Sequence, residues 1–264
     1  MVEENRLTQY QQYLLDKVNR TSRRRASTTR RKAHFTATQQ NGLERAREKL
    51  GGARLVMNRN LRQMSILQPL IENLLRIPRF YSRMEIGDFP DGARDQNLRT
   101  RIMVEFKLYG ATPDLQVVFS HMLDAERPLY ASLDYIDAPQ SLAPLRHWGW
   151  HRFRLRNEVK ERCTFTPSDS FFAEREQVFL WKDIDGVLAQ RAAGGRYWFE
   201  YINSALEPFS MVEGVGYIEA QILGGVTLAD VDRLYYPEAE HLDMEFFSSL
   251  ERLRDEYGIE LIAY

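Results

Sequence analysis

The chain is built mainly from short segments with the composition and alternation of β-strands, separated by turn residues, and only a few segments have helical periodicity. Strands are expected at residues 54–58, 101–109, 129–135, 152–155, 163–166, 216–223 and 259–264. Helices are expected at residues 65–75, 228–234 and 244–257. Because the strands do not alternate regularly with long helices, a doubly wound parallel sheet is disfavoured and the pattern predicts an α+β fold.

Residues 1–50 differ in composition from the rest and are expected to be a helical, basic segment that precedes a domain at residues 51–264. Apolar side chains recur at helical spacing as far as Val18, and the glycine pair after Leu50 would end a second helix. Between these helices, residues 20–32 are rich in Arg, Ser and Thr and have no apolar periodicity. This connector is therefore expected to be mobile until a partner binds it.

Positive charge is concentrated in one block near the N-terminus. The block begins at Lys17, ends at Lys32 and contains eight basic residues and no acidic one. Since the net charge is −1, the rest of the chain carries −9. This separation favours an anionic partner, either RNA or DNA or an acidic protein surface. A solvated arm that only confers solubility is an equally good interpretation.

The composition is typical of a globular protein with a sizeable core, because 44% of the 264 residues are hydrophobic and 28% are charged. A disulfide framework is excluded, since Cys163 is the only cysteine, and this indicates a reducing compartment. No run approaches the roughly 20 apolar residues that a bilayer requires, and no secretory signal is evident. We expect a protein of the cytoplasm, or one delivered into the cytoplasm of a target cell, without membrane contact.

Several catalytic signatures are absent from the sequence. There is no G-x-S-x-G motif and no Walker phosphate loop, and the glycines at 214 and 216 lack the third glycine of a dinucleotide fingerprint. His147 and His151 have the spacing of two metal ligands on a helix, but no third ligand is evident. A structural pair is favoured, no metal is expected, and a metal hydrolase is the weakest hypothesis. Cys163 is assigned to the core.

The segment at residues 216–225 has a distinctive alternation. As a strand it projects Tyr217, Glu219 and Gln221 to one side. A sheet face in contact with water would explain this alternation. However, a ring, a carboxylate and an amide flanked by glycines are also typical of a cleft lining.

A second strand, at residues 129–135, carries a matching set of side chains. Tyr130 and Ser132 point to one side of it, so an aromatic platform lies beside a hydroxyl. Alone, the tyrosine is a common core aromatic and the serine a common hydrogen-bonding group within a sheet. A site is therefore predicted only where this strand and the one containing Glu219 meet.

Four runs of sequence occur in a fixed order: ERPLYASLD at 126–134, RFRLRNEV at 152–159, RCTFTPSDS at 162–170 and YIEAQILG at 217–224. Together they resemble a bacterial family of formerly unknown function that is similar to a branch of the ADP-ribosyltransferases. The resemblance covers about residues 53–264. It implies a split, mostly antiparallel sheet with flanking helices, which binds NAD as a substrate.

The resemblance also implies the site residues. In ADP-ribosyltransferases, three strands present an Arg or His, then a Ser or Tyr, then a Glu. By position these are Arg59, then Tyr130 with Ser132, then Glu219 with Gln221 two residues further on. Arginine-type enzymes place a Glu or Gln before the catalytic Glu, whereas here the Glu comes first. Further NAD contacts are expected from Arg152, Ser168, Asp169 and Ser170.

The chemistry of ADP-ribosyl transfer gives these residues their expected roles. Breaking the bond between nicotinamide and ribose builds positive charge on the sugar, which the Glu219 carboxylate would stabilise. Arg59 would hold a phosphate oxygen or a ribose hydroxyl. Tyr130 would stack on nicotinamide, and Ser132 would orient the carboxylate or the ribose.

Two hypotheses follow from the sequence. The first is a mono-ADP-ribosyltransferase that modifies a nucleic acid or a protein as a toxin, effector or defence protein, with a neutralising protein as a further expected partner. The second is a noncatalytic RNA- or DNA-binding module that acts through the basic N-terminal arm.

Overall fold

A computed structural model describes residues 7–65, 68–82, 85, 93–110, 122–134, 149–194 and 217–264. The strands of the main sheet are β1 (Arg54–Arg59), β4 (Leu129–Asp134), β5 (His151–Leu155), β6 (Cys163–Thr166), β7 (Phe179–Leu180), β8 (Glu219–Ile222), β9 (Val231–Tyr236) and β10 (Glu260–Ala263). The short strands β2 (Met64–Ser65) and β3 (Gln68–Pro69) form a separate pair. The helices are α1 (Gln9–Lys32), α2 (Ala37–Gly51), α3 (Leu70–Arg76), α5 (Ala93–Tyr109), α7 (Asp185–Gly194) and α9 (Met244–Tyr257).

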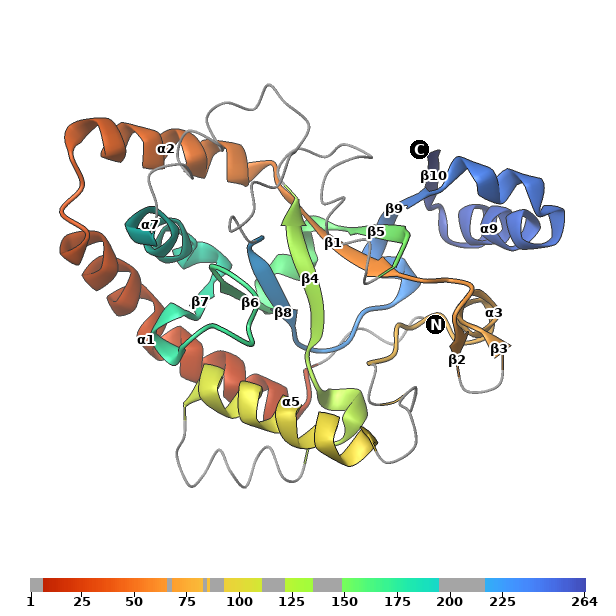
Figure 1. The fold of residues 1–264 in the computed structure, drawn as a ribbon, viewed down its shortest axis with the longest axis horizontal. Coiled ribbons are helices and arrows are strands. Elements are labelled where there is room, and N and C mark those ends of the chain that lie inside the picture. The colour runs from red at the N-terminus through yellow and green to blue at the C-terminus, as the bar shows by residue number, and fades with distance from the viewer. Residues whose placement is uncertain are drawn as a thin grey trace.

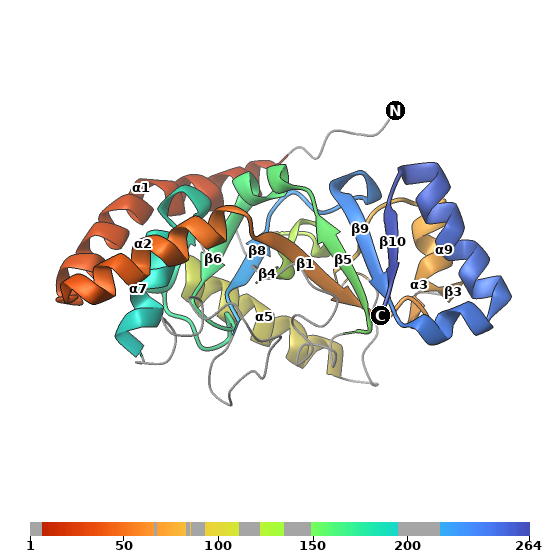
Figure 2. The same cartoon turned by 90° about the horizontal axis from the view of Figure 1, so that it is seen from above.

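The main sheet has eight strands in the order β10-β9-β5-β1-β4-β8-β6-β7. Within it, β9 and β10 are parallel and the other described neighbours are antiparallel. Figures 1 and 2 show α1, α2 and α7 gathered at one end of the sheet, and α3 and α9 at the other. The fold is therefore mixed, with a mostly antiparallel sheet, which is compatible with the α+β class predicted from the sequence.

Most of the predicted elements are confirmed. The strands expected at 54–58, 129–135, 152–155, 163–166, 216–223 and 259–264 correspond to β1, β4, β5, β6, β8 and β10, and the helix at 244–257 is α9. The helix expected at 65–75 begins only at Leu70. Residues 66, 67, 135 and 216 lie outside the described residues.

Two predicted elements are wrong. Residues 101–109, expected as a strand, belong to helix α5. Their alternating apolar residues also satisfy helical spacing, because Val104 and Leu108 are four apart and both are buried. Residues 228–234, expected as a helix, form a short 3-10 turn, η6 (Leu228–Asp230), followed by β9.

The two faces of the main sheet differ in chemistry. Directly paired residues point to the same side, and the pairings of Ser132 with Val56 and with Glu219 connect the faces of three strands. One face is apolar and joins α2, α3, α7 and α9 in the main hydrophobic core. The opposite face is polar and largely buried. It carries Arg54, Val56, Asn58, Tyr130, Ser132, Asp134, Arg152, Arg154, Thr164, Thr166, Glu219, Gln221, Arg233 and Tyr235.

Cys163 belongs to the apolar face, as predicted. It is fully buried in the main core, and this burial raises the pKa of its thiol to about 12. A thiol with so high a pKa is a poor nucleophile at neutral pH.

The basic block is not a mobile connector, because it lies within the continuous 24-residue helix α1. A stripe of Leu14, Val18, Ser22 and Ala26 is buried along this helix. The Ser22 hydroxyl accepts a hydrogen bond of 3.1 Å from the backbone N–H of Leu180 in the edge strand β7. Arginine favours helices and small residues permit close packing, so a serine and an alanine are sufficient to continue the buried stripe beyond Val18.

Within residues 7–50 the structure contains helices α1 and α2, which are joined by residues 33–36. Ala26 of α1 and Leu43, Ala46 and Leu50 of α2 are buried in the same hydrophobic core as the main sheet. The boundary near residue 50 stays a prediction. Over the described part of the chain, no helix combines the length and apolar character needed to cross a membrane.

The docking of α1 can be tested by removing one buried side chain. Leu14→Ala should lower the free energy of unfolding by about 2–4 kcal/mol, because Leu14 is fully buried between α1 and α5. Urea denaturation followed by circular dichroism would measure this change. The control Leu242→Ala truncates a side chain that is 87% exposed, and should change the free energy of unfolding by less than about 0.5 kcal/mol. Equal stabilities of the two variants would contradict the docking.

Candidate active site

Glu219 lies on the polar sheet face at the start of β8, and its side chain is held by three hydrogen-bond donors. One carboxylate oxygen, Oε1, accepts from the backbone N–H of Ser170 at 3.1 Å and from Nε2 of Gln221 at 3.0 Å. The other, Oε2, accepts from the Tyr217 hydroxyl at 3.1 Å. The residue is only 5% exposed. These contacts fix both the position and the rotation of the carboxylate.

Gln221 is locked by a directed chain of hydrogen bonds. The Tyr109 hydroxyl lies 3.0 Å from the Thr164 hydroxyl, which donates to Oε1 of Gln221 at 2.9 Å. The Gln221 Nε2 group donates to Thr166 at 3.1 Å and to Glu219. Every polar atom of the Gln221 side chain is thereby engaged. The amide therefore suits a positioning role, and Glu219 is the group left to act on a substrate.

The environment of Glu219 favours the protonated carboxyl group. Burial is the largest cause that raises the pKa of Glu219, hydrogen bonds from Ser170 and Gln221 oppose it, and the Asp169 charge adds to it. The Tyr217 hydroxyl lies between the two carboxylates, at 3.1 Å from Glu219 and 3.3 Å from Asp169. Its single proton is thus shared between two acceptors.

Helix α5 covers part of this face with a polar stripe. Arg101, Glu105 and Tyr109 are four residues apart and therefore lie on one side of the helix. Glu105 accepts a hydrogen bond of 2.6 Å from Arg127, and both side chains are almost fully buried. Burial raises the pKa of Glu105 to about 7. The stripe thus sets a charged helix face against a polar sheet face.

Arg101 brings a guanidinium group to the site. Its Cζ atom lies 4.4 Å from the centroid of the Tyr130 ring, in a cation–π contact. Burial lowers the pKa of Arg101, but the nearby Tyr130 hydroxyl and the Glu219 and Glu105 carboxylates outweigh that effect, so its pKa is raised. A guanidinium, an aromatic ring and a carboxylate are therefore grouped around the junction of β4 and β8.

Six of the site residues predicted from sequence are brought together. Tyr130 pairs with Gln221 and Ser132 pairs with Glu219 across β4 and β8, and Ser170 binds Glu219 through its backbone. Asp169 joins them through Tyr217. The backbone carbonyl of Ser168 accepts a hydrogen bond of 2.7 Å from the Thr166 hydroxyl.

Arg59 is not part of this group. It alternates with Val56 along β1, and Val56 faces the same side as Ser132, so the register places Arg59 on the opposite face. Its guanidinium donates to the backbone carbonyl of Asn58 at 2.9 Å, and burial lowers its pKa to about 10. Gly149, at φ 141°, lies so close that a Cβ there would overlap the Arg59 backbone. Asn58 is the polar residue of this strand on the face of the site.

Arg152 shares the polar face with Glu219 but is distant from it. It lies on β5, three strands from β8, which is a separation of about 14 Å at the usual strand spacing. Its guanidinium stacks over Tyr235 and Tyr264, with 5.2 Å and 4.7 Å from Cζ to the ring centroids. The structure therefore does not place Arg152 beside the carboxylate.

Sequence reasoning missed the contribution of α5. The signal was present, because Arg101, Glu105 and Tyr109 recur every four residues, but the alternation of apolar residues in the same segment favoured a strand. Thr164 and Thr166 were assigned to a strand without a role. Their partner on the next strand, Gln221, is identified only by the register.

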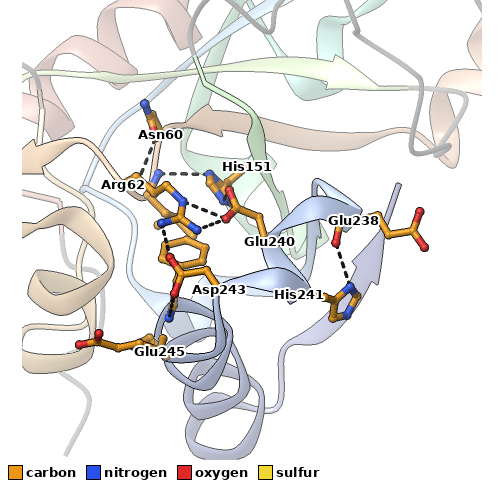
Figure 3. A network of polar contacts seen from close by, with 11 residues as sticks. Asn60, Arg62, His151, Glu238, Glu240, His241, Asp243 and Glu245 are labelled. Atoms are coloured by element: carbon orange, nitrogen blue, oxygen red, sulfur yellow. Dashed lines mark hydrogen bonds and ion pairs between the residues drawn. The ribbon is translucent and has the colours of Figure 1, made fainter.

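A second polar network lies at the edge of the molecule, where the β1–β2 connection meets α9 (Figure 3). Arg62 donates to Glu240 at 2.8 Å and to Asp243 at 2.8 Å, and its Cζ atom lies 4.0 Å from the centroid of the Phe246 ring. Asp243 also caps α9 by accepting from the Phe246 N–H. Arg62 is shared between two carboxylates, so this network docks α9 onto the β1–β2 connection.

His151 belongs to that network and not to a metal site. Its Nδ1 accepts from the Leu61 N–H at 3.2 Å, and its Nε2 lies 3.5 Å from Glu240. Burial lowers its pKa to about 4. His147, the other histidine of the sequence pair, lies outside the described residues. Within the described ranges, no three His, Cys, Asp or Glu side chains gather as metal ligands would.

Comparison with known proteins identifies no family for this chain. No protein-family model matches the chain, and a search of curated proteins finds no match. The functional argument therefore rests on the site itself.

His151 gives a prediction for the pH dependence of stability. Its pKa is about 4 in the folded protein and near 6.5 when unfolded, so the unfolded chain binds more protons between these values. The free energy of unfolding should fall by up to about 3 kcal/mol as the pH is lowered from 6.5 to 4. Urea denaturation at several pH values would show a shallower fall for His151→Asn.

The matched control for this measurement is His34→Asn. His34 is exposed and has φ 45°, a conformation that Asn tolerates well. This variant should keep the pH dependence of the wild-type protein. A His151→Asn curve parallel to the wild-type curve would show that the histidine is not buried in its neutral form.

Proposed function

We propose that the chain is a mono-ADP-ribosyltransferase that uses NAD as a substrate and Glu219 as its catalytic carboxylate. The observation that carries the proposal is the carboxylate itself. It lies on a polar sheet face, is held by Tyr217, Gln221 and Ser170, and has an aromatic ring and a guanidinium beside it. The mostly antiparallel sheet is compatible with the split sheet that the sequence resemblance implies.

The fixed carboxylate suits the stabilisation of a positively charged sugar. As the bond to nicotinamide breaks, the electron pair leaves with the nicotinamide and the ribose becomes electron-poor. A carboxylate already held in place stabilises that charge without reorganising in the transition state. Only the ionised form of Glu219 can do this, and its pKa is raised. Activity should therefore decrease as the pH falls through that pKa.

Arg101 takes the role that the sequence assigns to Arg59. It lies on the same side of the sheet as Glu219, whereas the register places Arg59 on the other face. A guanidinium offers a planar set of donors for a diphosphate or a ribose hydroxyl. Because Arg101 covers the Tyr130 ring, NAD must displace the guanidinium before nicotinamide can stack on that ring.

The proposed role of Glu219 predicts a loss of turnover on removing its charge. Glu219→Gln should lower the rate of nicotinamide release at saturating NAD by about 100-fold or more, because the lost interaction is made mainly in the transition state. Chromatographic detection of nicotinamide would measure the rate, and binding of NAD should change little.

Glu240→Gln is the matched control, since it makes the same chemical change in the network that docks α9. This variant should retain nicotinamide release. The proposal fails if the wild-type protein releases no nicotinamide in the presence of RNA, DNA or protein acceptors, or if Glu219→Gln releases it at the wild-type rate. Nucleic-acid binding without release would support the noncatalytic RNA- or DNA-binding module.

A second experiment distinguishes the proposed roles of Arg101 and Arg59. Arg101→Ala should lower kcat/KM for NAD by about tenfold or more, mainly through KM, because a charge-assisted contact to the substrate is lost. Arg59→Ala should stay within about threefold of the wild-type value. Steady-state kinetics of nicotinamide release would measure both. If Arg59→Ala lowered kcat/KM more than Arg101→Ala, Arg59 would be the NAD-binding arginine instead.

The acceptor of the ADP-ribose is a macromolecule in this proposal, either nucleic acid or protein. The protein would act as a toxin, effector or defence protein in the cytoplasm, with a neutralising protein as a further partner. These roles rest on the resemblance of the sequence, and mass spectrometry of modified acceptors would test them.

A further inference from the structure

Helix α1 borders two hollows, which have the same net positive charge but differ in their ion pairs. The first hollow, of about 540 Å³, lies where α1 meets α7 and the short 3-10 helix η4 (Arg175–Gln177). The second, of about 640 Å³, lies where α1 meets α2 and α7. Both hollows are lined by arginines of the basic block, so the folding of this block into a helix creates two cationic surfaces.

The first hollow has an uncompensated positive charge. Its ionisable lining consists of Arg24, Arg25, Lys32, Arg175 and a single acid, Glu176, which gives a net charge of +3. Three threonines and Gln190 add uncharged donors. Among the described residues, no carboxylate forms an ion pair with any of these four basic side chains.

The second hollow also has a net charge of +3, from five basic side chains and two acids, but one of its acids is engaged in ion pairs. Asp185 forms ion pairs of 3.5 Å with Arg30 and 3.4 Å with Arg47. These pairs join α1, α2 and α7, so part of the charge there has a structural role. The first hollow has no equivalent arrangement, and its charges are available to a ligand.

Two of the cations in the first hollow are held in place by the fold. The Arg25 guanidinium donates to the backbone carbonyl of Arg175 at 2.7 Å, and that of Val178 lies 3.4 Å away. Burial lowers the pKa of Arg25, and the nearby Arg175 guanidinium lowers it further. The Arg175 side chain lies against Gly110, where a Cβ would approach within 2.8 Å of its Nε atom. An anion in the hollow would relieve the repulsion between these two fixed guanidinium groups.

We infer that the first hollow binds the phosphate backbone of a nucleic acid. Arg24 and Lys32 are eight residues apart on α1, or about 12 Å along the helix, so the hollow spans more than one phosphate. Guanidinium groups and hydroxyls are the donors that phosphate oxygens prefer.

The lining favours nucleic acid over an acidic protein. Ala33 is its only apolar residue, whereas protein–protein interfaces usually have an apolar core. A site made of charges and hydroxyls matches the electrostatic binding of a phosphate backbone, which needs no apolar contact. This inference does not depend on Glu219 or on NAD.

The test is the binding of a fluorescently labelled 20-nucleotide single-stranded RNA, and of the matching DNA, measured by anisotropy at several salt concentrations. The variant is Arg24→Glu with Lys32→Glu, because both side chains are exposed and neither makes an ion pair with a described residue. It should weaken binding by about tenfold or more and reduce the slope of log Kd against log salt by about one to two.

The control combines Arg99→Glu with Arg252→Glu, which changes the net charge of the protein equally at exposed positions of α5 and α9. It should bind nearly as the wild-type protein does, and Glu219→Gln should as well. Thermal melts would verify that each variant is folded.

Three results would overturn the inference. The first is no binding of RNA or DNA at about 50 mM salt. The second is equal binding by the two charge-reversed variants, which would show that binding depends only on the net charge of the protein. The third is equally tight binding of poly-glutamate, which would make the hollow a docking site for acidic proteins. None of these results bears on nicotinamide release.

Discussion

A buried polar sheet face is the constraint on which the rest of this structure depends. Removing a carboxylate, an amide and several hydroxyls from water costs free energy unless each is hydrogen-bonded inside the protein. Here the partners come from separate parts of the chain, because Tyr109 lies on α5, Thr164 and Thr166 on β6, and Glu219 and Gln221 on β8. One chain of hydrogen bonds therefore connects α5 and β6 to the Glu219 carboxylate.

The same constraint explains what the sequence could predict. Period-two alternation placed Glu219 and Gln221 on one face of one strand, and it did so for Tyr130 and Ser132, without knowledge of any pairing. It could not show which strands are neighbours. The expected position of Arg59 beside Glu219 was wrong for this reason, because a one-residue difference in register decides which face of the sheet a side chain occupies. Helix α5 was missed because its sequence fits two periodicities at once.

Helix α1 shows a different limit of sequence reasoning. A helix usually buries an apolar stripe, and the basic block has none. The structure uses a serine and an alanine there, and Ser22 satisfies an N–H group of the edge strand β7. Covering that edge prevents pairing with other chains, and the arginines on the rest of the helix remain directed to the surface. The block thus stabilises the fold on one side and concentrates charge on the other.

The presence of a buried polar network, whose desolvation costs free energy, is itself an argument for function. Apolar residues of similar size in place of Glu105 and Arg127, or of Glu219 and Gln221, would avoid the cost of desolvation, and such replacements often stabilise proteins. A purely structural network could also be built with an amide at position 219, because its oxygen could accept from Ser170 and Gln221 while its NH2 group donates to Tyr217, whose hydroxyl can donate to Asp169. A carboxylate adds a charge that burial disfavours. That charge favours the cationic form of Arg101, and in the proposed reaction it would also stabilise an electron-poor ribose.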